Sequence, residues 1–162
     1  MPEIKIRNAK DLEKVLKIVV KNALEDTGED MVDVVKEEIY STVYSSYLPV
    51  SYERTGDLAE SLESTKATED GNSINVEVKH NTDKIYSVAP NQHYSVVDGR
   101  SSSESIAEIV HNGLAPNIFN GEDYPWMHRR PYMDDAKERL KKYKEHIDAM
   151  KKYLKKQGIK TE

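Results

Sequence analysis

The chain has 162 residues, of which 33% are charged and 37% hydrophobic, and its formal net charge is -5. This length suits one domain with a modest core. Cysteine is absent, which excludes disulfides, thiolate zinc sites and cysteine nucleophiles. The first residues lack the apolar segment of a signal peptide, and no apolar run reaches the ~18 residues of a membrane span. The composition therefore predicts a soluble protein, made in the cytoplasm, without membrane contact.

Charge is unevenly distributed along the chain. Residues 137–160 carry ten Lys and Arg against three acidic residues, a net charge of +7 in a chain whose total is -5. The remainder is correspondingly acidic. A solvated helix face explains such a basic segment, and so does a face turned towards nucleic acid or towards an acidic neighbour.

Residues 8–47 have helical periodicity. Asp11 is a suitable start signal for a first helix over residues 10–25. Its apolar side chains recur on one side, at Leu12, Val15, Leu16, Val19, Ala23 and Leu24. Thr27 followed by Asp30 predicts an N-cap, and a second stripe follows. The break at Thr27-Gly28 predicts either two helices or one long helix with a kink.

The segment SYERTGDLAESL, residues 51–62, has Arg54, Thr55 and Gly56 at its centre. A phosphate-binding loop needs several glycines followed by Lys and Ser or Thr, and this segment has a single glycine. A structural corner fits better, because Thr55 suits an N-cap and Gly56 suits an unusual backbone conformation. Arg54 then remains available to an acidic partner. Two leucines of the segment can bury against the preceding helix, Leu58 and Leu62.

Residues 61–98 change to the alternating pattern of half-buried strands. Asp70-Gly71-Asn72 is a hairpin signal and Asn81-Thr82-Asp83 a second turn. A third strand is predicted over residues 85–88, and HYSVVDG supplies a fourth. The chain is therefore expected to be α+β, with long N-terminal and C-terminal helices packed on a small three- to four-stranded antiparallel sheet.

Two more helices follow the sheet. A short one over residues 103–113 begins near Ser103 and ends at Gly113, and a polar loop occupies residues 114–130. The last helix covers residues 131–157, about 40 Å, which is longer than a core of this size needs. Its narrow heptad seam is Met133, Ala136, Leu140, Tyr143, Ile147, Met150 and Leu154. One partner helix can cover that seam, either the N-terminal helix or a neighbouring subunit.

The motifs predict no catalytic residue, metal site or cofactor. The five histidines lack the close spacing of metal ligands, and the serines lack the Gly-x-Ser-x-Gly motif of a nucleophile. An alternative interpretation is a metal-dependent nuclease, which would recruit Asp98, Glu104, Glu108 and His111. A third is a nucleic-acid-binding protein that uses the basic C-terminal helix.

Three segments, in this order, resemble the motifs of the tail-completion proteins of tailed bacteriophages, which join head to tail and are also called neck or minor tail proteins. They are PVSYERTGDLAESL, IAEIVHNG and RRPYMDDAKERL. The matching positions are Pro49, Arg54, Thr55, Gly56, Leu58 and Ser61, the segment from Ile106 to Gly113, and Arg130, Pro131, Tyr132, Met133, Ala136 and Leu140. His111-Asn112 departs from the acid usual there, and the insert over residues 91–103 is long.

The resemblance implies a non-enzymatic structural virion protein that forms a ring of about six copies at the neck. Its partners would be the head-completion or connector protein and the tail terminator or tail tube protein, with genomic DNA passing through the lumen without sequence specificity. Aromatic residues and Arg are favoured at protein interfaces. On that ground, and on charge, the expected contact residues are Arg54, Thr55, Gly56, Tyr124, Trp126, Arg129, Arg130, Lys141, Lys144, Lys151 and Lys155.

Overall fold

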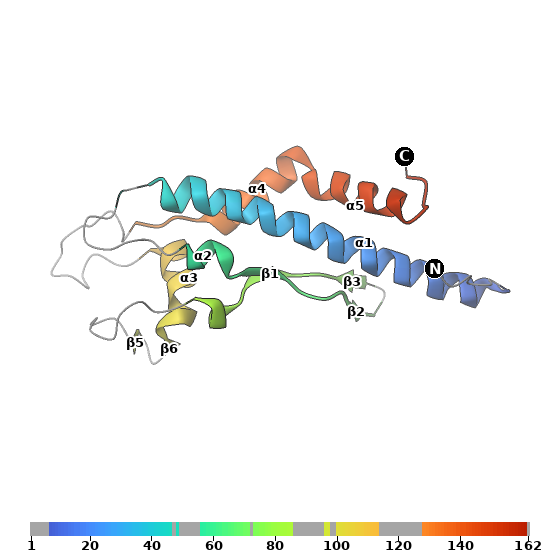
Figure 1. The fold of residues 1–162 in the computed structure, drawn as a ribbon, viewed down its shortest axis with the longest axis horizontal. Coiled ribbons are helices and arrows are strands. Elements are labelled where there is room, and N and C mark those ends of the chain that lie inside the picture. Colours follow the sequence, from blue (N-terminus) through green and yellow to red (C-terminus); the bar gives the residue numbers. More distant parts are fainter. Residues whose placement is uncertain are drawn as a thin grey trace.

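One long helix forms the axis of the molecule, and the other elements lie along it (Figure 1). The computed structural model describes residues 7–46, 48, 56–71, 73–85, 96–97, 100–113 and 128–161. The elements in chain order are α1 (Ala9–Glu38), the π-helical η1 (Ile39–Tyr44), α2 (Asp57–Glu60), β1 (Leu62–Ser64), β2 (Thr68–Asp70), β3 (Ser73–Asn75), β4 (Val78–His80), the 3-10 turn η2 (Thr82–Lys84), β5 (Val96–Val97), β6 (Arg100–Ser101), α3 (Ser102–Asn112), α4 (Tyr132–Tyr143) and α5 (Glu145–Lys156). Helices combined with antiparallel strands confirm the α+β class.

α1 is a single helix of 30 residues, about 45 Å long. It begins at the N-cap Asn8, whose side chain accepts a 2.9 Å hydrogen bond from the Asp11 N–H. The predicted cap at Thr27 is wrong. Thr27 lies inside the helix, where its hydroxyl donates to the Ala23 carbonyl at 2.7 Å.

Gly28 has a packing role rather than a helix-ending role. A Cβ atom at Gly28 would lie 2.3 Å from Ser64 Oγ and 2.6 Å from Val76 Cγ1. Both neighbours belong to the strand segment that runs beside α1 (Figure 1). The glycine therefore lets that segment approach the helix backbone closely.

The central strands form one long hairpin instead of a three- or four-stranded sheet. β1 pairs with β4 and β2 with β3, both antiparallel. Thr65 and Glu77 connect the two ribbons, because the Thr65 N–H donates to the Glu77 carbonyl at 2.8 Å. The predicted turn at Asp70-Gly71-Asn72 is confirmed by the pairing of Asp70 with Ser73.

Within the described residues no further strand pairs with the β1–β4 ribbon, and the chain turns directly after β4. The Asn81 side chain accepts a hydrogen bond from the Asp83 N–H at 3.1 Å, and η2 follows, as the predicted second turn required. Most of the predicted third strand lies outside the described residues. The predicted fourth strand is present as β5, but it pairs only with β6, in a separate two-stranded ribbon.

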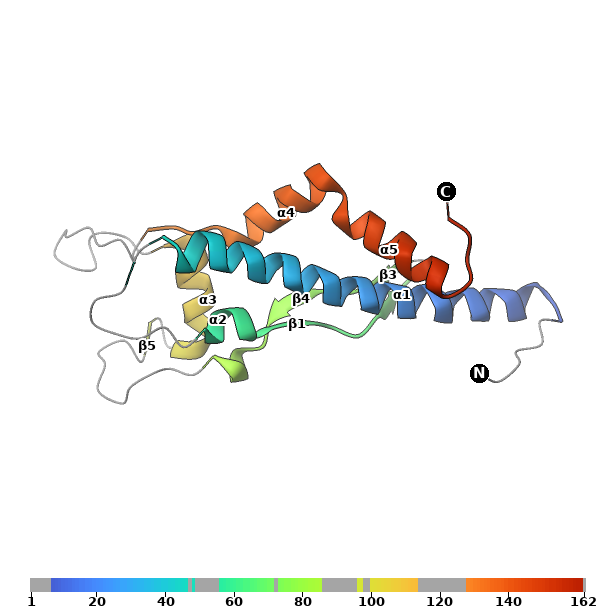
Figure 2. The ribbon, with the colours of Figure 1, turned by 45° about the horizontal axis from the view of Figure 1, so that its top comes forward.

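The predicted helix over residues 131–157 is two helices. Lys144 has a φ of 58°, in the left-handed region, and separates α4 from α5. Figure 2 shows the two helices meeting at an angle, with their junction standing away from α1. Because of this break, the heptad seam does not continue on one face across Lys144. The two seam residues nearest the break, Tyr143 and Ile147, are 59% and 41% exposed. We call residues 143–147 the elbow.

On either side of the elbow, α1 covers the seam. Of the two predicted alternatives, the N-terminal helix or a neighbouring subunit, this is the first. Ala136 of α4 and Ala149 of α5 are buried, and Met150 Sδ lies 3.6 Å from the Thr27 hydroxyl. The core lies mainly along the second half of α1 and around η1. It is formed by Met31, Val32, Val34, Val35, Ile39, Val43, Leu58, Ala59, Leu62, Tyr132, Ala136 and Ala149.

Candidate assembly surfaces

The predicted corner is partly described by the structure. Gly56 has a φ of 85° and occupies the N-cap position of α2, so the unusual backbone expected there is confirmed. Gly56 takes the position predicted for Thr55, and both Arg54 and Thr55 lie outside the described residues. Leu58 and Leu62 are buried, as predicted. The corner thus fixes the start of α2 against the core.

A hydrogen-bonded chain of three side chains, with Ser61 and Tyr132 buried and His80 half-buried, lies next to this corner. Ser61 Oγ is 2.7 Å from His80 Nδ1, and His80 Nε2 is 2.8 Å from the Tyr132 hydroxyl. Ser61 also donates to the Leu58 carbonyl at 2.8 Å. His80 Nδ1–H therefore donates to Ser61, and Nε2 accepts from Tyr132. These contacts join α2, the β1–β4 ribbon and α4.

This cluster is structural in character. Ser61 is 0% exposed, so its hydroxyl cannot meet a substrate. Burial lowers the pKa of His80 to about 4, and burial also raises the pKa of Tyr132. All three groups are therefore neutral at pH 7. Because the residues are far apart in the sequence, no local motif signals their contact.

The two arginines before α4 have different environments. Arg129 is exposed and its guanidinium lies 2.8 Å from Asp134 Oδ2. Arg130 is buried, and its N–H donates to the Val110 carbonyl at 3.0 Å, which ties α4 to α3. Arg130 thus has a structural position, whereas Arg129 and Lys141 line a shallow surface hollow on α4. Tyr124 and Trp126, predicted beside them, lie outside the described residues.

Arg139, which the sequence did not single out, connects α4 and the start of α5 with the end of α1. Its guanidinium lies 2.7 Å from Glu37 Oε2, 3.3 Å from Glu38 Oε1 and 3.1 Å from Glu145 Oε1. The hydrogen bond with Glu37, followed by that with Glu145, raises the pKa of Arg139 further above neutrality. One cation therefore connects the end of α1 with both sides of the Lys144 break.

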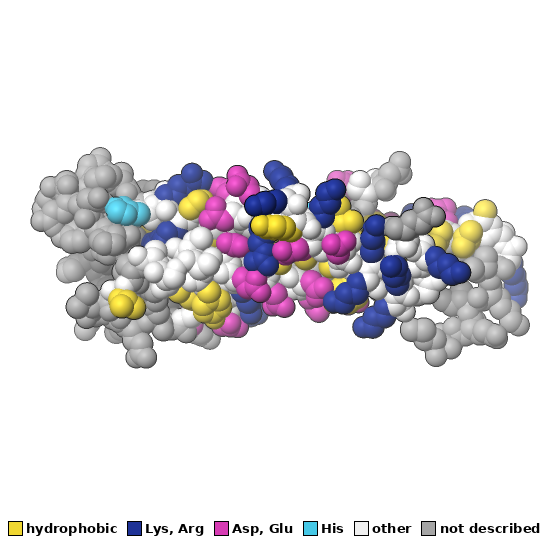
Figure 3. All heavy atoms as spheres, turned by 90° about the horizontal axis from the view of Figure 1, so that it is seen from above, with side chains coloured by type: hydrophobic (Ala, Val, Ile, Leu, Met, Phe, Trp, Pro, Cys, Tyr) yellow, Lys and Arg dark blue, Asp and Glu magenta, His cyan; other side chains and the backbone are white. Residues whose placement is uncertain are grey.

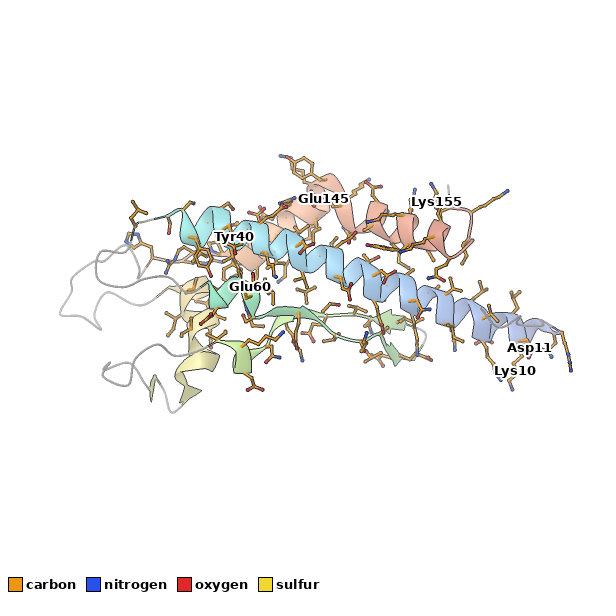
Figure 4. The ribbon with its side chains drawn as sticks, in the orientation of Figure 1. Lys10, Asp11, Tyr40, Glu60, Glu145 and Lys155 are labelled. Atoms are coloured by element: carbon orange, nitrogen blue, oxygen red, sulfur yellow. The ribbon has the colours of Figure 1, made fainter. Side chains whose placement is uncertain are left out.

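The predicted basic face forms a ridge on α4 and α5. Among the residues that the structure describes, none forms an ion pair with Lys141, Lys144, Lys151 or Lys155, which we call the lysine ridge. Lys155 lies on the side of α5 that faces away from α1 (Figure 4). Lys152 differs, because it pairs with Asp30 at 3.1 Å. The ridge is therefore positive charge that the described part of the chain does not neutralise.

The first turns of α1 expose two residues of the predicted apolar stripe, Leu12 and Leu16, and also Ile18, which lies on the opposite face of the helix. We call residues 9–20 of α1 the arm. Leu12, Leu16 and Ile18 are 44%, 43% and 54% exposed. The arm extends past the end of α5 (Figure 1), and hydrophobic side chains are visible there among lysines in Figure 3. Figure 3 also shows acidic side chains gathered over the middle of the molecule.

Two other classes of site are absent from the described part of the chain. No helix there is long and apolar enough to span a membrane. Within the same residues, no group of three His, Cys, Asp or Glu side chains could hold a metal ion. Of the residues recruited by the nuclease interpretation, His111 lies 3.4 Å from Asp134 and packs edge-on against Tyr132, while Asp98 lies outside the described residues.

The family model described as YomN matches residues 8–156, which is nearly the whole chain. No curated protein and no solved structure matches.

Proposed function

The chain belongs to the YomN family, a phage-derived and prophage-related family, and from that premise we propose that it is a structural virion protein of the phage neck. In this role it joins the head-completion or connector protein to the tail terminator or tail tube protein. It acts as a ring of about six copies, made in the host cytoplasm and incorporated into the virion. It has no enzymatic activity of its own.

The observation that carries the proposal is the uncovered apolar stripe of the arm on an elongated molecule. Leu12 and Leu16 lie one helical turn apart and each remains more than 40% exposed, and a contiguous exposed apolar patch is typical of an interaction surface. The lysine ridge adds a second surface that lacks a partner among the described residues. A protein with two such surfaces is suited to assembly.

The positions of the tail-completion motifs also support the proposal. Gly56 turns the chain, Leu58 is buried beside it, and Tyr132 begins α4 in the core. Each of these matching residues thus has a role in shaping the fold. In the proposed ring, the lysine ridge faces either the genomic DNA in the lumen, without sequence specificity, or an acidic neighbour.

The test is electron microscopy of particles made by a phage whose copy of this gene carries an early stop codon. The expected result is filled heads beside separate, finished tails, because each part assembles but the joint is missing. A plasmid-borne copy of the gene should restore joined particles and serves as the control. Intact infectious particles without the protein would contradict the proposal and would favour the nucleic-acid-binding interpretation.

A further inference from the structure

The second half of α1 carries an acidic surface on its outer side. Residues 22–40 contain seven acidic residues and a single lysine, Lys36, a net charge of -6. The acidic side chains that border α5 are neutralised within the chain, as Asp30 is by Lys152 at 3.1 Å. Three acidic side chains on the outer side have no ion-pair partner among the described residues: Asp26, Glu29 and Asp33. The outer side of α1 therefore keeps negative charge that the described chain does not neutralise.

The lysine ridge is the opposite of this surface in charge. Residues 141–156 contain seven lysines against Glu145 and Asp148, a net charge of +5. The ridge lies on the side of α5 that faces away from α1, as Lys155 shows in Figure 4. The ridge of one chain therefore cannot cover the acidic surface of the same chain.

The two surfaces have matching spacings along their helices. One side of α1 and the start of η1 presents four residues at spacings of 4, 3 and 4, which we call the α1 stripe: Glu29, Asp33, Lys36 and Tyr40. The outer side of α5 and its N-cap has the same spacings in the reverse direction, and we call it the α5 stripe: Lys155, Lys151, Asp148 and Lys144. Because one helical turn has 3.6 residues, each set lies on one side of its helix. Placed antiparallel, the stripes set an acid against a lysine at three levels and Lys144 against the Tyr40 ring at the fourth.

The exceptions in the two charge patterns correspond as well. Asp148 interrupts the basic stripe and Lys36 the acidic one, and the antiparallel register places these two residues at the same level. Lys36 pairs with Glu60 at 3.2 Å, and its side chain is still 26% exposed. Tyr40 is 51% exposed, so its ring is accessible to a cation. A parallel arrangement with the same central pair would instead bring Asp148 level with Asp30, which carries the same charge.

We infer that the α1 stripe of one copy binds the α5 stripe of a second copy of this chain, with Asp33 opposite Lys151 and Glu29 opposite Lys155. The inference deepens the proposed ring and rests on that proposal. Because the two stripes are different surfaces, the contact is heterologous, and its repetition adds copies head to tail. Within one copy α5 runs opposite to α1 (Figure 1). An antiparallel contact between copies therefore leaves their α1 helices pointing the same way, as rotation about an axis along these helices requires.

Cysteine cross-linking tests the contact, since the natural chain contains no cysteine. Glu29→Cys and Lys155→Cys are made as two full-length proteins of different mass and are mixed under oxidising conditions. Each protein carries one cysteine, so a disulfide between the two variants joins two different molecules. These sites leave the central pair, Asp33 and Lys151, available for charge reversal.

The expected result is a heterodimer of the two variants, with at least about tenfold less of it when Glu77→Cys replaces Glu29→Cys. Glu77 is exposed on the hairpin and is the matched control. Glu37→Cys is the control for direction, because it lies about 12 Å further along α1, where a parallel arrangement would bring Lys155. A disulfide needs Cα atoms about 6 Å apart, so the two directions give different products.

Charge reversal tests the central pair. Asp33→Lys in the Glu29→Cys protein should lower the yield at least about fivefold, because it sets two lysines against each other. Lys151→Asp in the Lys155→Cys protein should then restore the yield, whereas Glu77→Lys, a reversal of the same size on the hairpin, should leave it unchanged. A yield equal to that of the Glu77→Cys control, a cross-link mainly through Glu37→Cys, or no response to Asp33→Lys would overturn the inference.

The two proposals fail separately. If the stop-codon phage makes joined particles while the cross-link forms, the neck role is wrong and the contact stands. If heads and tails separate but the cross-link does not form, the neck role stands and the contact is wrong. Salt-dependent binding of DNA to the lysine ridge would then assign that surface to the genomic DNA in the lumen.

Discussion

The hydroxyl of Tyr132 donates a 2.8 Å hydrogen bond to Nε2 of His80, and this contact fastens the first turn of α4 to the last residue of β4. Both residues belong to the hydrogen-bonded chain that ends at Ser61. The contact joins parts of the sequence that are remote from each other. Its loss should therefore lower the free energy of unfolding of the whole domain.

Tyr132→Phe is expected to lower the free energy of unfolding by about 1–3 kcal/mol, because His80 Nε2 would lose its donor in a buried site. Urea denaturation followed by circular dichroism measures the change. Tyr143→Phe is the matched control, because that ring is 59% exposed, and it should change stability by less than about 0.5 kcal/mol. Equal effects of the two substitutions would contradict this account.

Stability should fall as the pH is lowered from about 6.5 to about 4, because burial lowers the pKa of His80 to about 4 in the folded protein. Above pH 6.5 both states hold neutral imidazole and the contribution is complete. Between these values the unfolded chain binds a proton that the folded chain excludes. The loss should be about 2 kcal/mol in wild-type protein.

Denaturation at several pH values measures this loss, with His80→Gln as the control. The hydrogen bond from the Ala67 N–H lowers the pKa of Glu25 in the folded protein. Protonation of such carboxylates destabilises the wild-type protein and the His80→Gln variant alike on acidification. The difference between the two pH profiles therefore isolates His80. Parallel profiles would show that His80 accepts its proton equally well in both states.

Gly28→Ala should destabilise the fold although alanine is the better helix former. The new methyl group would meet Ser64 and Val76, at a cost of about 1–3 kcal/mol, against a gain in helix propensity of about 1 kcal/mol. In a double-mutant cycle with Val76→Ala, the coupling should be at least about 1 kcal/mol. The exposed Asn22→Ala in the same helix is the control and should not couple to Val76→Ala.

Lys144→Gly should stabilise the protein by about 0.5–1 kcal/mol, because a left-handed φ of 58° is strained for lysine and unstrained for glycine. Lys144→Val should be destabilising for the same reason. Thermal unfolding at low protein concentration measures both changes in the single chain. If glycine destabilises as much as valine, the lysine side chain has a role that its backbone angle does not explain.

The lysine ridge should give non-specific DNA affinity that depends strongly on salt. Lys151→Gln combined with Lys155→Gln should reduce the slope of log K against log salt by about two, since each lysine contacts about one phosphate. Lys10→Gln with Lys14→Gln, two exposed lysines of the arm, is the matched control and should leave the slope unchanged. Fluorescence anisotropy with a random-sequence duplex measures these slopes. If neither double variant changes the slope, the ridge does not bind DNA, and an acidic protein neighbour becomes the preferred partner.

Local signals in the sequence predicted most helices and strands correctly, but they did not predict where the long helices break. The hairpin turn near Gly71 and the stop at Gly113 depend on short-range chemistry, and both were predicted. The cap predicted at Thr27 failed because Gly28 is required by a hairpin far along the chain. No Gly or Pro marks the break at Lys144, which the contacts of Arg139 with Glu37 and Glu145 support from outside the local sequence.

The candidate surfaces were predicted unevenly for a related reason. The lysine ridge follows from residue type and helical spacing, so Lys144, Lys151 and their neighbours could be chosen from the sequence, and their role as contact residues stays a prediction. The arm stripe was found as a pattern, but periodicity alone does not tell whether another element covers it. That answer depends on where α5 ends relative to α1, which is a tertiary relationship.

α1 runs without interruption from the exposed arm into the core. This continuity lowers the free-energy cost of forming helix in the arm. The first turn of an isolated helix is unfavourable to form, whereas each further residue on an existing helix adds one hydrogen bond at little cost. Because Val32 and Val35 hold the second half of α1 in the core, the arm extends a helix that is already nucleated. A partner that bound the arm would therefore meet it in an ordered conformation, and less of the interaction energy would be lost to ordering the chain.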